Sequence, residues 1–186
     1  MTVQKQLLDL YAHEPDPWGF LSSWYERRKY ALTLAALPRE RYRAAYEPGC
    51  SIGVLTRLLA DRCDTLVASD FIPAAVARAR EQVADLPHVR VDELVTPREW
   101  PVGTFDLIVV SELAYFLQPD EVRELGRLIG GSIEAGGSVV MVHWLGPIDA
   151  WALPAAAAHA CIADAAGLST TARLADERFL LEVFAR

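Results

Sequence analysis

Short apolar runs alternate with amphipathic stretches from residue 42 almost to the end of the 186-residue chain. The strand-like runs are YRAAYE, TLVASD, FDLIVVSE and GGSVVMVHW, and each is followed by a stretch whose apolar residues recur at helical spacing. This alternation predicts a parallel sheet covered by helices on both faces. The runs FDLIVV and SVVMVHW are almost continuously apolar, which is typical of central strands buried on both sides.

The two ends of the chain depart from this pattern. Near the C-terminus, STTARLA and RFLLEVFA are strand-like runs that flank Asp176 and Glu177, so they predict a hairpin and one antiparallel strand. Before the sheet, SSWYERRKYALTLAALP has a serine cap, Glu26 in its first turn and Pro38 after its end. These start and stop signals predict an N-terminal helix.

The length of the chain suits one domain with a full core. We expect a single domain over residues 1–186, with an N-terminal helical cap or lid at 1–38 and the sheet core at 42–186. Neither end shows a basic run followed by an apolar stretch and a cleavage site, which favours the cytoplasm. The oligomeric state does not follow from the sequence.

The charge and composition of the chain disfavour several classes of binding partner and site. A net charge of −7 repels nucleic-acid backbones, so nucleic acid is not expected to bind. The longest apolar segment, WALPAAAAHACIADAAGL, is interrupted by proline, histidine and aspartate and predicts a helix that does not span a membrane. The three cysteines form no C-x-x-C pair, which argues against a disulfide framework or a zinc site and favours reduced thiols.

The stretch YEPGCSIGVLTRLLA lies where the first strand of the sheet turns into a helix. In a doubly wound sheet, this turn borders the ligand crevice at the carboxyl ends of the strands. Gly49 can adopt a positive φ, and Gly53 lets the helix approach the strand closely. Asp70 ends the second strand, where a carboxylate can accept both hydroxyl groups of a ribose. The pattern predicts a nucleoside site.

The charge and spacing of this loop indicate which nucleoside binds. A dinucleotide site has the pattern G-x-G-x-x-G, but here Ser51 takes the place of the second glycine and the acidic Glu47 precedes the loop. A carboxylate at this position disfavours phosphate groups, and no G-K-[ST] pair indicates a nucleoside triphosphate. S-adenosylmethionine fits better because it carries a sulfonium and an α-amino group and no phosphate. Glu47 would then face its methionine end, directly or through water.

Taken together, EPGCSIG, Asp70 and FDLIVVSELAYFL resemble class I S-adenosylmethionine-dependent methyltransferases over essentially the whole chain. The segments DPWGF, YERRKY, SELAYFL and VHW are further similar to NodS-like enzymes, which methylate the free amino group of a chito-oligosaccharide. The resemblance implies a doubly wound, Rossmann-like α/β sheet of seven strands in the order 3-2-1-4-5-7-6, with strand seven antiparallel. It also implies S-adenosylmethionine as cofactor, S-adenosylhomocysteine as product, and a small-molecule amine acceptor such as an amino sugar or oligosaccharide.

The residues expected at the cofactor lie in the glycine loop, at strand tips or in the N-terminal cap: Glu47, Gly49, Cys50, Gly53, Asp70, Phe71, Ile72, Leu94, Val95, Ser111, Trp18 and Lys29. For the adenine, the register of VRVDELVTPREW leaves Asp92 and the backbone of Leu94 and Val95 as alternatives. We favour the backbone, with the base between Phe71, Ile72 and Val95. The resemblance aligns Lys29 with a basic position that could pair with the methionine carboxylate; a solvated helix face is the alternative.

Three residues near strand tips are the candidates for the acceptor side. The tips of the fourth and fifth strands carry SELAYF and HW, and they face the transferred methyl group in this architecture. Glu112 is an acid at the end of a buried strand, and Tyr115 follows it. His143 has a side chain whose pKa suits proton transfer near neutral pH. We therefore expect Glu112, Tyr115 and His143 to be the catalytic residues.

Other polar and aromatic residues have weaker assignments. Asp149 and Trp151 could form a wall of the acceptor pocket or lie on the surface. Trp18 and Tyr25 could close over the cofactor, since aromatic side chains exclude water well, or could simply pack the N-terminal helix on the sheet. His159, among alanines, is interpreted as a packing or surface residue.

The leading interpretation is a small-molecule N-methyltransferase. An O-methyltransferase acting on a hydroxyl or carboxyl group would need the same cofactor site. A nicotinamide-dependent oxidoreductase is disfavoured by Glu47 and Ser51, and a cofactor-binding protein without turnover remains an alternative.

Overall fold

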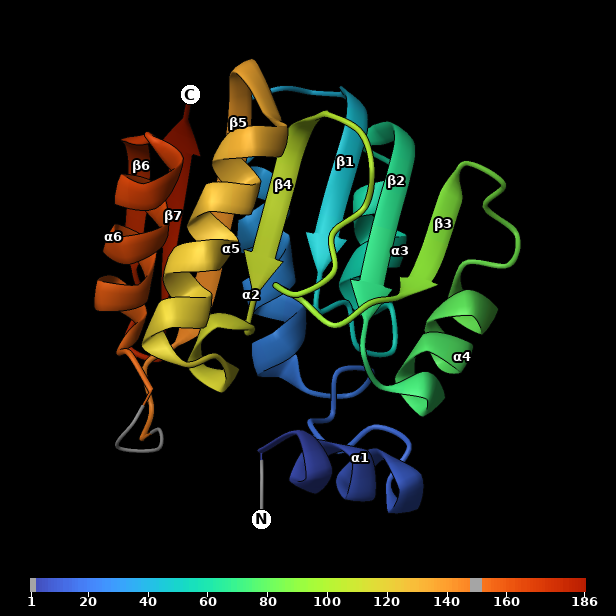
Figure 1. The fold of residues 1–186 in the computed structure, drawn as a ribbon. Coiled ribbons are helices and arrows are strands. Elements are labelled where there is room, and N and C mark those ends of the chain that lie inside the picture. Colours follow the sequence, from blue (N-terminus) through green and yellow to red (C-terminus); the bar gives the residue numbers. More distant parts are fainter. Residues whose placement is uncertain (1–2, 148–151) are drawn as a thin grey trace.

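The computed structural model describes residues 3–147 and 152–186, and its sheet has helices on both faces (Figure 1). The strands are, in chain order, β1 (Tyr42–Pro48), β2 (Cys63–Asp70), β3 (Val89–Glu93), β4 (Phe105–Ser111), β5 (Ile133–Trp144), β6 (Ser169–Ala175) and β7 (Phe179–Ala185). The sheet order is β3-β2-β1-β4-β5-β7-β6. Strands β1 to β5 pair in parallel, whereas β7 runs antiparallel to both β5 and β6. The predicted fold, with its strand order and C-terminal hairpin, is confirmed.

Helices precede the sheet and connect its strands. They are α1 (Val3–His13), α2 (Trp24–Ala35), α3 (Val54–Ala60), α4 (Pro73–Gln82), the short 3-10 helix η1 (Ala114–Phe116), α5 (Pro119–Ser132) and α6 (Ala155–Ala166). Helix α2 starts after the N-cap Ser23 and ends before Pro38, as the start and stop signals predict.

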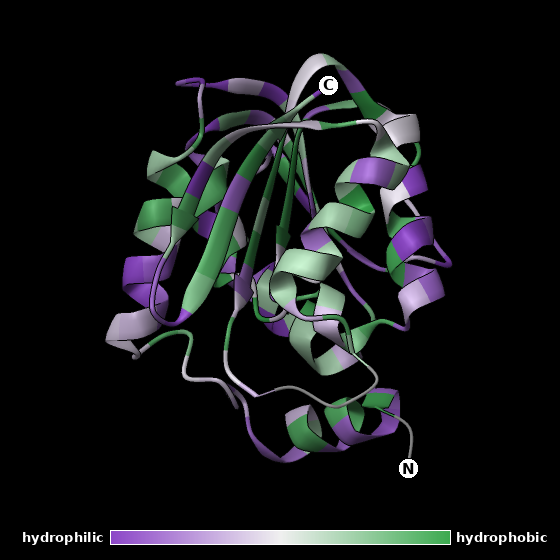
Figure 2. Cartoon of the chain, turned by 90° about the vertical axis from the view of Figure 1, so that its left-hand side faces the viewer, coloured by the Kyte–Doolittle hydropathy of each residue, from purple (hydrophilic) through white to green (hydrophobic). Residues whose placement is uncertain are grey.

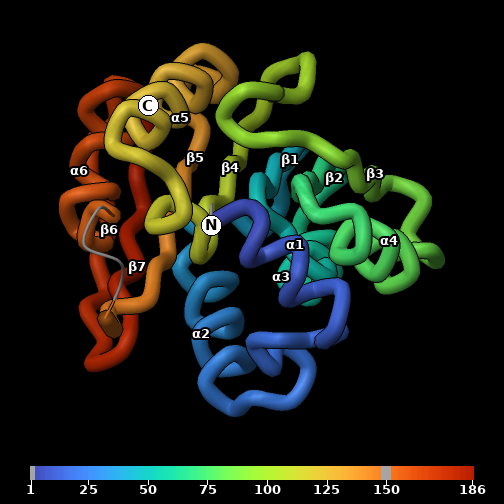
Figure 3. Tube along the Cα trace, turned by 60° about the horizontal axis from the view of Figure 1, so that its bottom comes forward, coloured from blue at the N-terminus to red at the C-terminus, as the bar shows by residue number. Residues whose placement is uncertain are grey.

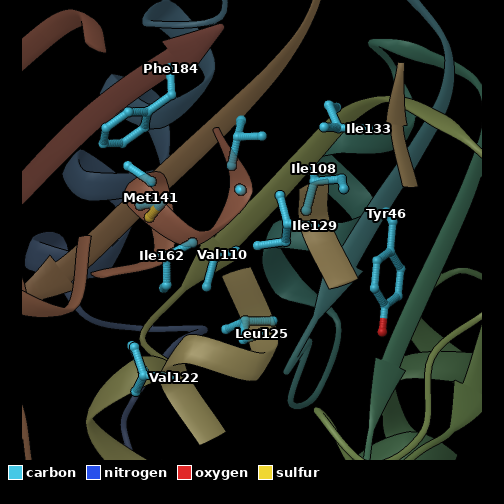
Figure 4. Packing of buried hydrophobic residues seen from close by; sticks show 14 of the residues in the cluster. Tyr46, Ile108, Val110, Val122, Leu125, Ile129, Ile133, Met141, Ile162 and Phe184 are labelled. Atoms are coloured by element: carbon cyan, nitrogen blue, oxygen red, sulfur yellow. The ribbon is translucent and has the colours of Figure 1, made fainter. Parts of the chain in front are cut away.

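Apolar side chains fill both faces of the sheet. On one face, α5 and α6 pack against β4, β5 and β7 through residues such as Leu125, Ile129, Ile162 and Met141 (Figure 4). On the other face, α2 and α3 pack against the same central strands, with α4 beside α3. The strand β4 is buried along its whole length, as its continuous apolar run predicts.

Helix α1 is absent from the sequence-based prediction. Its apolar residues Val3, Leu7, Leu10 and Tyr11 recur at helical spacing, so a signal was present. The helix does not join either face of the sheet; it lies below the carboxyl ends of the strands (Figures 1 and 3). Figure 2 shows it apart from the hydrophobic strands and their covering helices. It packs instead on residues of the glycine loop and the start of α4.

Among the described residues, none of the helices has both the length and the apolar character needed to cross a membrane.

Candidate active site

A cavity of about 870 Å³ lies at the carboxyl ends of the central strands and is lined by residues of the sheet, α1 and α2. Its volume falls in the upper part of the range for small-molecule sites. Its walls come from the N-terminal cap, the glycine loop and the segments that follow β2, β3, β4 and β5. Thirteen of the predicted site residues line it: Trp18, Lys29, Glu47, Gly49, Cys50, Asp70, Phe71, Ile72, Leu94, Val95, Ser111, Glu112 and Tyr115.

The glycine loop turns as predicted. Gly49 has a φ of +75° and Gly53 a φ of +81°, which are left-handed values that favour glycine. A Cβ on Gly49 would lie 3.2 Å from Leu113 Cδ1 at the cavity wall, and one on Gly53 would lie 2.9 Å from the backbone of Ala79 in α4. Gly49 therefore permits the turn and the close approach of Leu113 at the cavity wall, while Gly53 does not line the cavity and permits close packing of α3 on α4.

Asp70 is buried at the tip of β2 and lines the cavity. Its Oδ2 accepts the N–H of Ser51 at 2.9 Å, and its Oδ1 accepts the N–H of Ile72 at 3.0 Å. Burial raises the pKa of this carboxyl group, and the two backbone N–H donors oppose the rise. The carboxylate thus links the glycine loop to the end of β2, at the edge where a ribose is expected.

Glu47 is the second acid of this edge and is only 2% exposed. Its Oε2 accepts a hydrogen bond from the Thr56 hydroxyl at 2.6 Å. Burial raises the pKa of Glu47 from 4.5 to about 8, with the Thr56 hydroxyl opposing the rise and Asp70 adding to it. A cationic ligand group beside this carboxyl would favour its ionised form.

The adenine side is formed by the ends of β2 and β3. Leu94 and Val95 line the cavity, whereas Asp92 lies in β3 and bonds to Arg90 Nε at 2.9 Å. The structure thus places Asp92 in the strand, as the sequence interpretation favours. The Leu94 N–H donates to the Asp70 carbonyl at 3.0 Å, and the Val95 N–H donates to an exposed Glu99 carboxylate at 2.8 Å. Backbone contacts to adenine from this pair stay a prediction.

Lys29 lies in a buried network of charges between α2 and the tip of β4. Its side chain is 1% exposed, and its Nζ lies 2.6 Å from Glu112 Oε1 and 2.9 Å from Glu26 Oε2. Burial raises the pKa of Glu26, and the Lys29 ammonium opposes this rise. One cation therefore faces two carboxylates at the cavity wall, which leaves the cluster one negative charge in excess when both acids are ionised.

Glu112 has a backbone φ of +56°, a strained value for a residue with a side chain. Its Oε2 accepts hydrogen bonds from the Tyr115 hydroxyl and from the Trp144 N–H, the latter at 3.0 Å. Burial raises the pKa of Tyr115, and the neighbouring Glu112 carboxylate raises it further, so the phenol remains a donor. Glu112 and Tyr115 thus lie together at the tip of β4, at the cavity wall, and their catalytic role stays a prediction.

Tyr25 adds a free polar group to the same wall. Its hydroxyl is buried and has no hydrogen-bond partner among the described residues. Lys29 Nζ lies 4.9 Å from the centre of its ring, and Arg178 Cζ lies 3.9 Å from it on the strand hairpin side. A buried hydroxyl without a partner at a cavity wall indicates a place where a ligand can bond.

His143 does not line the cavity. The ring is fully buried, and its Nε2 accepts the N–H groups of Leu113 at 3.2 Å and Ala114 at 2.9 Å. Its Nδ1 lies 2.8 Å from His159 Nε2. Burial lowers the pKa of His143 well below 6.5. Both ring nitrogens are engaged within the protein, so these contacts do not support the predicted role as proton acceptor.

The remaining candidates take varied positions. Trp18 Nε1 donates to the Tyr11 hydroxyl at 3.1 Å, and Tyr11 bonds in turn to Ser51 Oγ at 2.6 Å, which ties the N-terminal cap to the glycine loop. His159 is buried and hydrogen-bonded, so its assignment as a packing residue holds and that as a surface residue is wrong. Asp149 and Trp151 lie outside the described residues.

Several lining residues lie beyond the sequence-based site, among them the polar or charged side chains of Tyr11, Glu26 and Arg178. For Tyr11 and Glu26 a signal existed, because Tyr11 belongs to the apolar face of α1 and Glu26 precedes Lys29 by three residues on α2. Arg178 comes from the turn between β6 and β7, and its position depends on the hairpin meeting α2.

The residues present fit S-adenosylmethionine. Gly49 brings the backbone of the loop to the cavity wall without a side chain, Asp70 offers a carboxylate at the ribose edge, and Glu47 offers an acid for a cation. Among the described residues, no cluster of acidic, histidine or cysteine side chains could hold a metal ion. The sheet order, the glycine turn and the two acids are those of class I S-adenosylmethionine-dependent methyltransferases.

Comparison with known proteins identifies the family within this class. The model of the Nodulation protein S (NodS) family matches residues 2–132, and the chain belongs to this family. It is 34% identical to Nodulation protein S of Bradyrhizobium diazoefficiens over 114 residues, which cover 61% of this chain and 54% of that protein. It is 30% identical to Nodulation protein S of Rhizobium tropici over 139 residues, covering 73% of this chain and 58% of that protein. The chain thus spans little more than half the length of these curated relatives.

Solved structures agree with this membership. The N-methyltransferase NodS from Bradyrhizobium japonicum WM9, in complex with S-adenosyl-L-homocysteine, has a TM-score of 0.86 and 25% identity, with 97% of each chain covered. A proposed methyltransferase from Pseudomonas syringae has 43% identity and a TM-score of 0.77, covering 88% of this chain and all of that one.

Proposed function

We propose that this chain transfers the methyl group of S-adenosylmethionine to the amino group of a small molecule such as an amino sugar or oligosaccharide. The observation that carries the proposal is the cluster of Glu26, Lys29 and Glu112 at the cavity wall. When both acids are ionised, two carboxylates around one ammonium leave an excess of negative charge, which attracts a second cation. A protonated amine is such a cation, and a hydroxyl or carboxylate acceptor is not.

The comparisons support an amine without identifying it. The structure from Bradyrhizobium japonicum is that of an N-methyltransferase, and it binds S-adenosyl-L-homocysteine. An O-methyltransferase family protein from Burkholderia thailandensis, at 16% identity, shares the fold alone.

On the cofactor side of the cavity, different residues would bind different parts of S-adenosylmethionine. Asp70 would hold the ribose hydroxyls, Glu47 would face the methionine end, and Phe71, Ile72 and Val95 would enclose the adenine. When bound, S-adenosylmethionine supplies an electrophilic methyl group on its sulfonium.

On the acceptor side, the protein has to orient an amine, exclude water and accommodate the proton that the nitrogen loses. The Glu112 carboxylate would accept an N–H of the amine, while the Tyr115 hydroxyl and the Trp144 N–H fix the carboxylate itself. The free hydroxyl of Tyr25 offers a second contact on the same wall. We infer that Glu112 replaces His143 as the group nearest the amine, and that the proton leaves through this carboxylate or solvent.

A transfer assay with tritiated methyl donor tests the proposal over matched sets of amine, hydroxyl and carboxyl acceptors. We expect incorporation with primary amines, amino sugars among them. Glu112→Gln should lower kcat/KM for the amine about 10- to 100-fold, the worth of a hydrogen bond to a charged group. Glu124→Gln makes the same substitution on a surface carboxylate with 46% side-chain exposure and should leave kcat/KM unchanged.

The alternatives give different results. Incorporation with hydroxyl or carboxyl acceptors alone would contradict the amine and support an O-methyltransferase. Binding of S-adenosylmethionine without transfer to any acceptor would indicate a non-catalytic cofactor-binding protein. Tryptophan fluorescence can monitor titrations with NADH and with S-adenosylmethionine. Tighter binding of NADH than of S-adenosylmethionine would indicate an oxidoreductase.

A further inference from the structure

We call the part of the cavity wall formed by Glu112 and Tyr115 the acceptor wall. A chain of three buried polar side chains runs from behind this wall to β7, which lies between β5 and the edge strand β6. His143 on β5, His159 on α6 and Glu182 on β7 come from elements that lie side by side (Figures 1 and 3). His143 Nδ1 lies 2.8 Å from His159 Nε2, and His159 Nδ1 lies 2.8 Å from Glu182 Oε2. These residues do not line the cavity, and the reaction proposed above does not use them.

The contacts allow only one arrangement of protons when both rings are neutral. His143 Nε2 receives two backbone N–H donors, from Leu113 and Ala114, so it must offer a lone pair. The proton of that ring therefore lies on Nδ1 and is donated to His159 Nε2. The proton of His159 then lies on Nδ1 and is donated to the Glu182 carboxylate, which fixes the direction of the whole chain.

The inner end of this chain holds a strained turn. Glu112 has a φ of +56° and is followed by Leu113 and Ala114, whose N–H groups point at His143 Nε2. A residue held in this backbone region persists only where its surroundings fix it. The Glu112 N–H also bonds to the Val142 carbonyl at 2.9 Å, so adjacent residues at the end of β5 fix consecutive N–H groups of the turn.

We propose that His143, His159 and Glu182 form a positioning chain that holds the 112–115 turn, and with it the Glu112 and Tyr115 side chains, in the acceptor wall. The carboxylate of Glu182 sets the tautomer of His159, which sets that of His143, which keeps Nε2 free to accept the two N–H groups. The link to methyl transfer rests on the proposed function of Glu112 and Tyr115. The tautomers of the two histidines and their hold on the turn do not depend on that proposed function.

Protonation of His159 would reverse the direction of the hydrogen bond between the two histidines. A proton added to His159 lies on Nε2 and points at His143 Nδ1, which forces the His143 proton onto Nε2, against the N–H groups of the turn. Charged and titratable groups face the two rings from five elements or turns: Glu182 on β7, Arg173 on β6, Lys29 on α2, Glu112 after β4 and Tyr115 on η1. Burial lowers the pKa of both histidines, while Glu182 opposes the shift at His159. We therefore expect the turn to be released only in acid, below pH 6.5.

Imidazole nitrogen NMR of the ¹⁵N-labelled full chain tests the tautomers directly. At pH 7.5, both rings should be neutral with Nδ1 protonated and Nε2 unprotonated. Protonated Nε2 on His143 in the wild-type protein would overturn the proposal. This measurement needs neither cofactor nor acceptor.

Substitution of His159 tests whether the positioning chain holds the 112–115 turn. In His159→Phe, His143 Nδ1 loses its acceptor, and amide exchange at Leu113 and Ala114 should accelerate at least about tenfold relative to Ile108, in the middle of β4. Glu182→Gln, which removes only the charge, should give a smaller change in the same direction and serves if His159→Phe does not fold. Met141→Ala is the matched control, because Met141 is a fully buried core residue two positions before His143 on the same strand. It should lower the melting temperature without selective exchange at the turn.

Activity separates this inference from the proposed function. With a productive amine, His159→Phe and Glu182→Gln should raise acceptor KM several-fold while the Kd for S-adenosylhomocysteine, measured by calorimetry, changes less than about twofold. Met141→Ala should leave KM unchanged. Equal exchange rates at Leu113 and Ala114 in wild type and both variants would overturn the positioning chain. Correct tautomers and accelerated exchange without methyl transfer to any amine would instead contradict the proposed function alone.

Discussion

Replacing Glu47 by glutamine should stabilise the cofactor-free protein. Glu47 is 2% exposed, and burial raises its pKa from 4.5 to about 8. Ionisation is therefore less favourable in the folded than in the unfolded chain, and the folded state loses relative stability as the pH rises from about 4.5 to about 8. At 1.36 kcal/mol per pKa unit, ionisation of Glu47 lowers the free energy of unfolding by about 1 kcal/mol at pH 5, about 3 kcal/mol at pH 7 and about 4 kcal/mol at pH 8. Glutamine removes this cost and can still accept the Thr56 hydrogen bond.

Urea unfolding of wild type and Glu47→Gln at pH 5, 6, 7 and 8 measures the difference directly. The gain in free energy of unfolding should grow with pH across this range, and at pH 7 it corresponds to a rise of roughly 6 to 12 °C in Tm. Glu124→Gln controls for the change in net charge. A gain that is the same at pH 5 and pH 8 would refute the raised pKa. The same variant should bind S-adenosylmethionine at least about tenfold more weakly, because it loses the acid that we propose to face the methionine end.

Other substitutions probe the loop, the ribose edge and the buried histidines. Asp70→Asn should weaken S-adenosylmethionine binding about 10- to 100-fold in calorimetry with unchanged circular dichroism, and unchanged affinity would refute the ribose assignment. Gly53→Ala should lower the free energy of unfolding by about 2 to 5 kcal/mol, because Gly53 has a positive φ and a Cβ there would contact α4 closely. Gly167 has a φ of +68° and no atom within 4 Å of an added Cβ, so Gly167→Ala should lower the free energy of unfolding by only about 1 to 2 kcal/mol. Equal losses in the two variants would contradict the close contact. Because burial lowers the pKa of His159, the unfolded chain binds more protons at this residue below pH 6.5, so its contribution to stability should fall as the pH drops. In urea unfolding, the free energy of unfolding of wild type minus that of His159→Phe should therefore decrease as the pH falls below 6.5, and a constant difference would contradict the lowered pKa.

The fold could be predicted because its signals are local. The β4 run FDLIVVS is buried at every position, so the continuous apolar pattern and the central strand correspond directly. The hairpin of β6 and β7 follows from two strand-like runs with a short polar turn between them. Helix α1 also has a local pattern, but its place below the strand ends depends on packing against Ile52 and Ile72, which no spacing within the helix reveals.

The cofactor edge was predictable for a similar reason. Gly49 and Asp70 lie at strand tips that the topology brings together, and their conformations follow from the residue type at the turn. The acceptor wall was harder, because it joins residues far apart in the sequence. Lys29 meets Glu112 across 83 positions, and nothing in the composition of α2 indicates that this lysine is buried while the two adjacent arginines are not.

His143 shows where sequence reasoning stops in physical terms. A histidine at a strand tip, with an ordinary pKa, suits proton transfer near neutral pH, and that property led to its assignment as a base. Its role depends instead on which nitrogen is occupied, and the partners are two N–H groups of the next turn and a histidine 16 residues away. Tertiary contacts alone determine that the lone pair on Nε2 and the proton on Nδ1 are both used within the protein.

The charge network around Lys29 bears on how this lysine can act. The sequence resemblance assigns it to the methionine carboxylate, yet its Nζ already lies within 3.1 Å of three acidic oxygens from Glu26 and Glu112. Releasing it to another anion would leave two neighbouring buried carboxylates without their cation, which is strongly unfavourable. Holding Glu112 is the role that its contacts support, because the ammonium fixes one oxygen of this carboxylate while Tyr115 and the Trp144 N–H fix the other. Since Lys29 lies on α2 and Trp144 ends β5, these two elements jointly determine the position of the Glu112 carboxylate at the cavity wall.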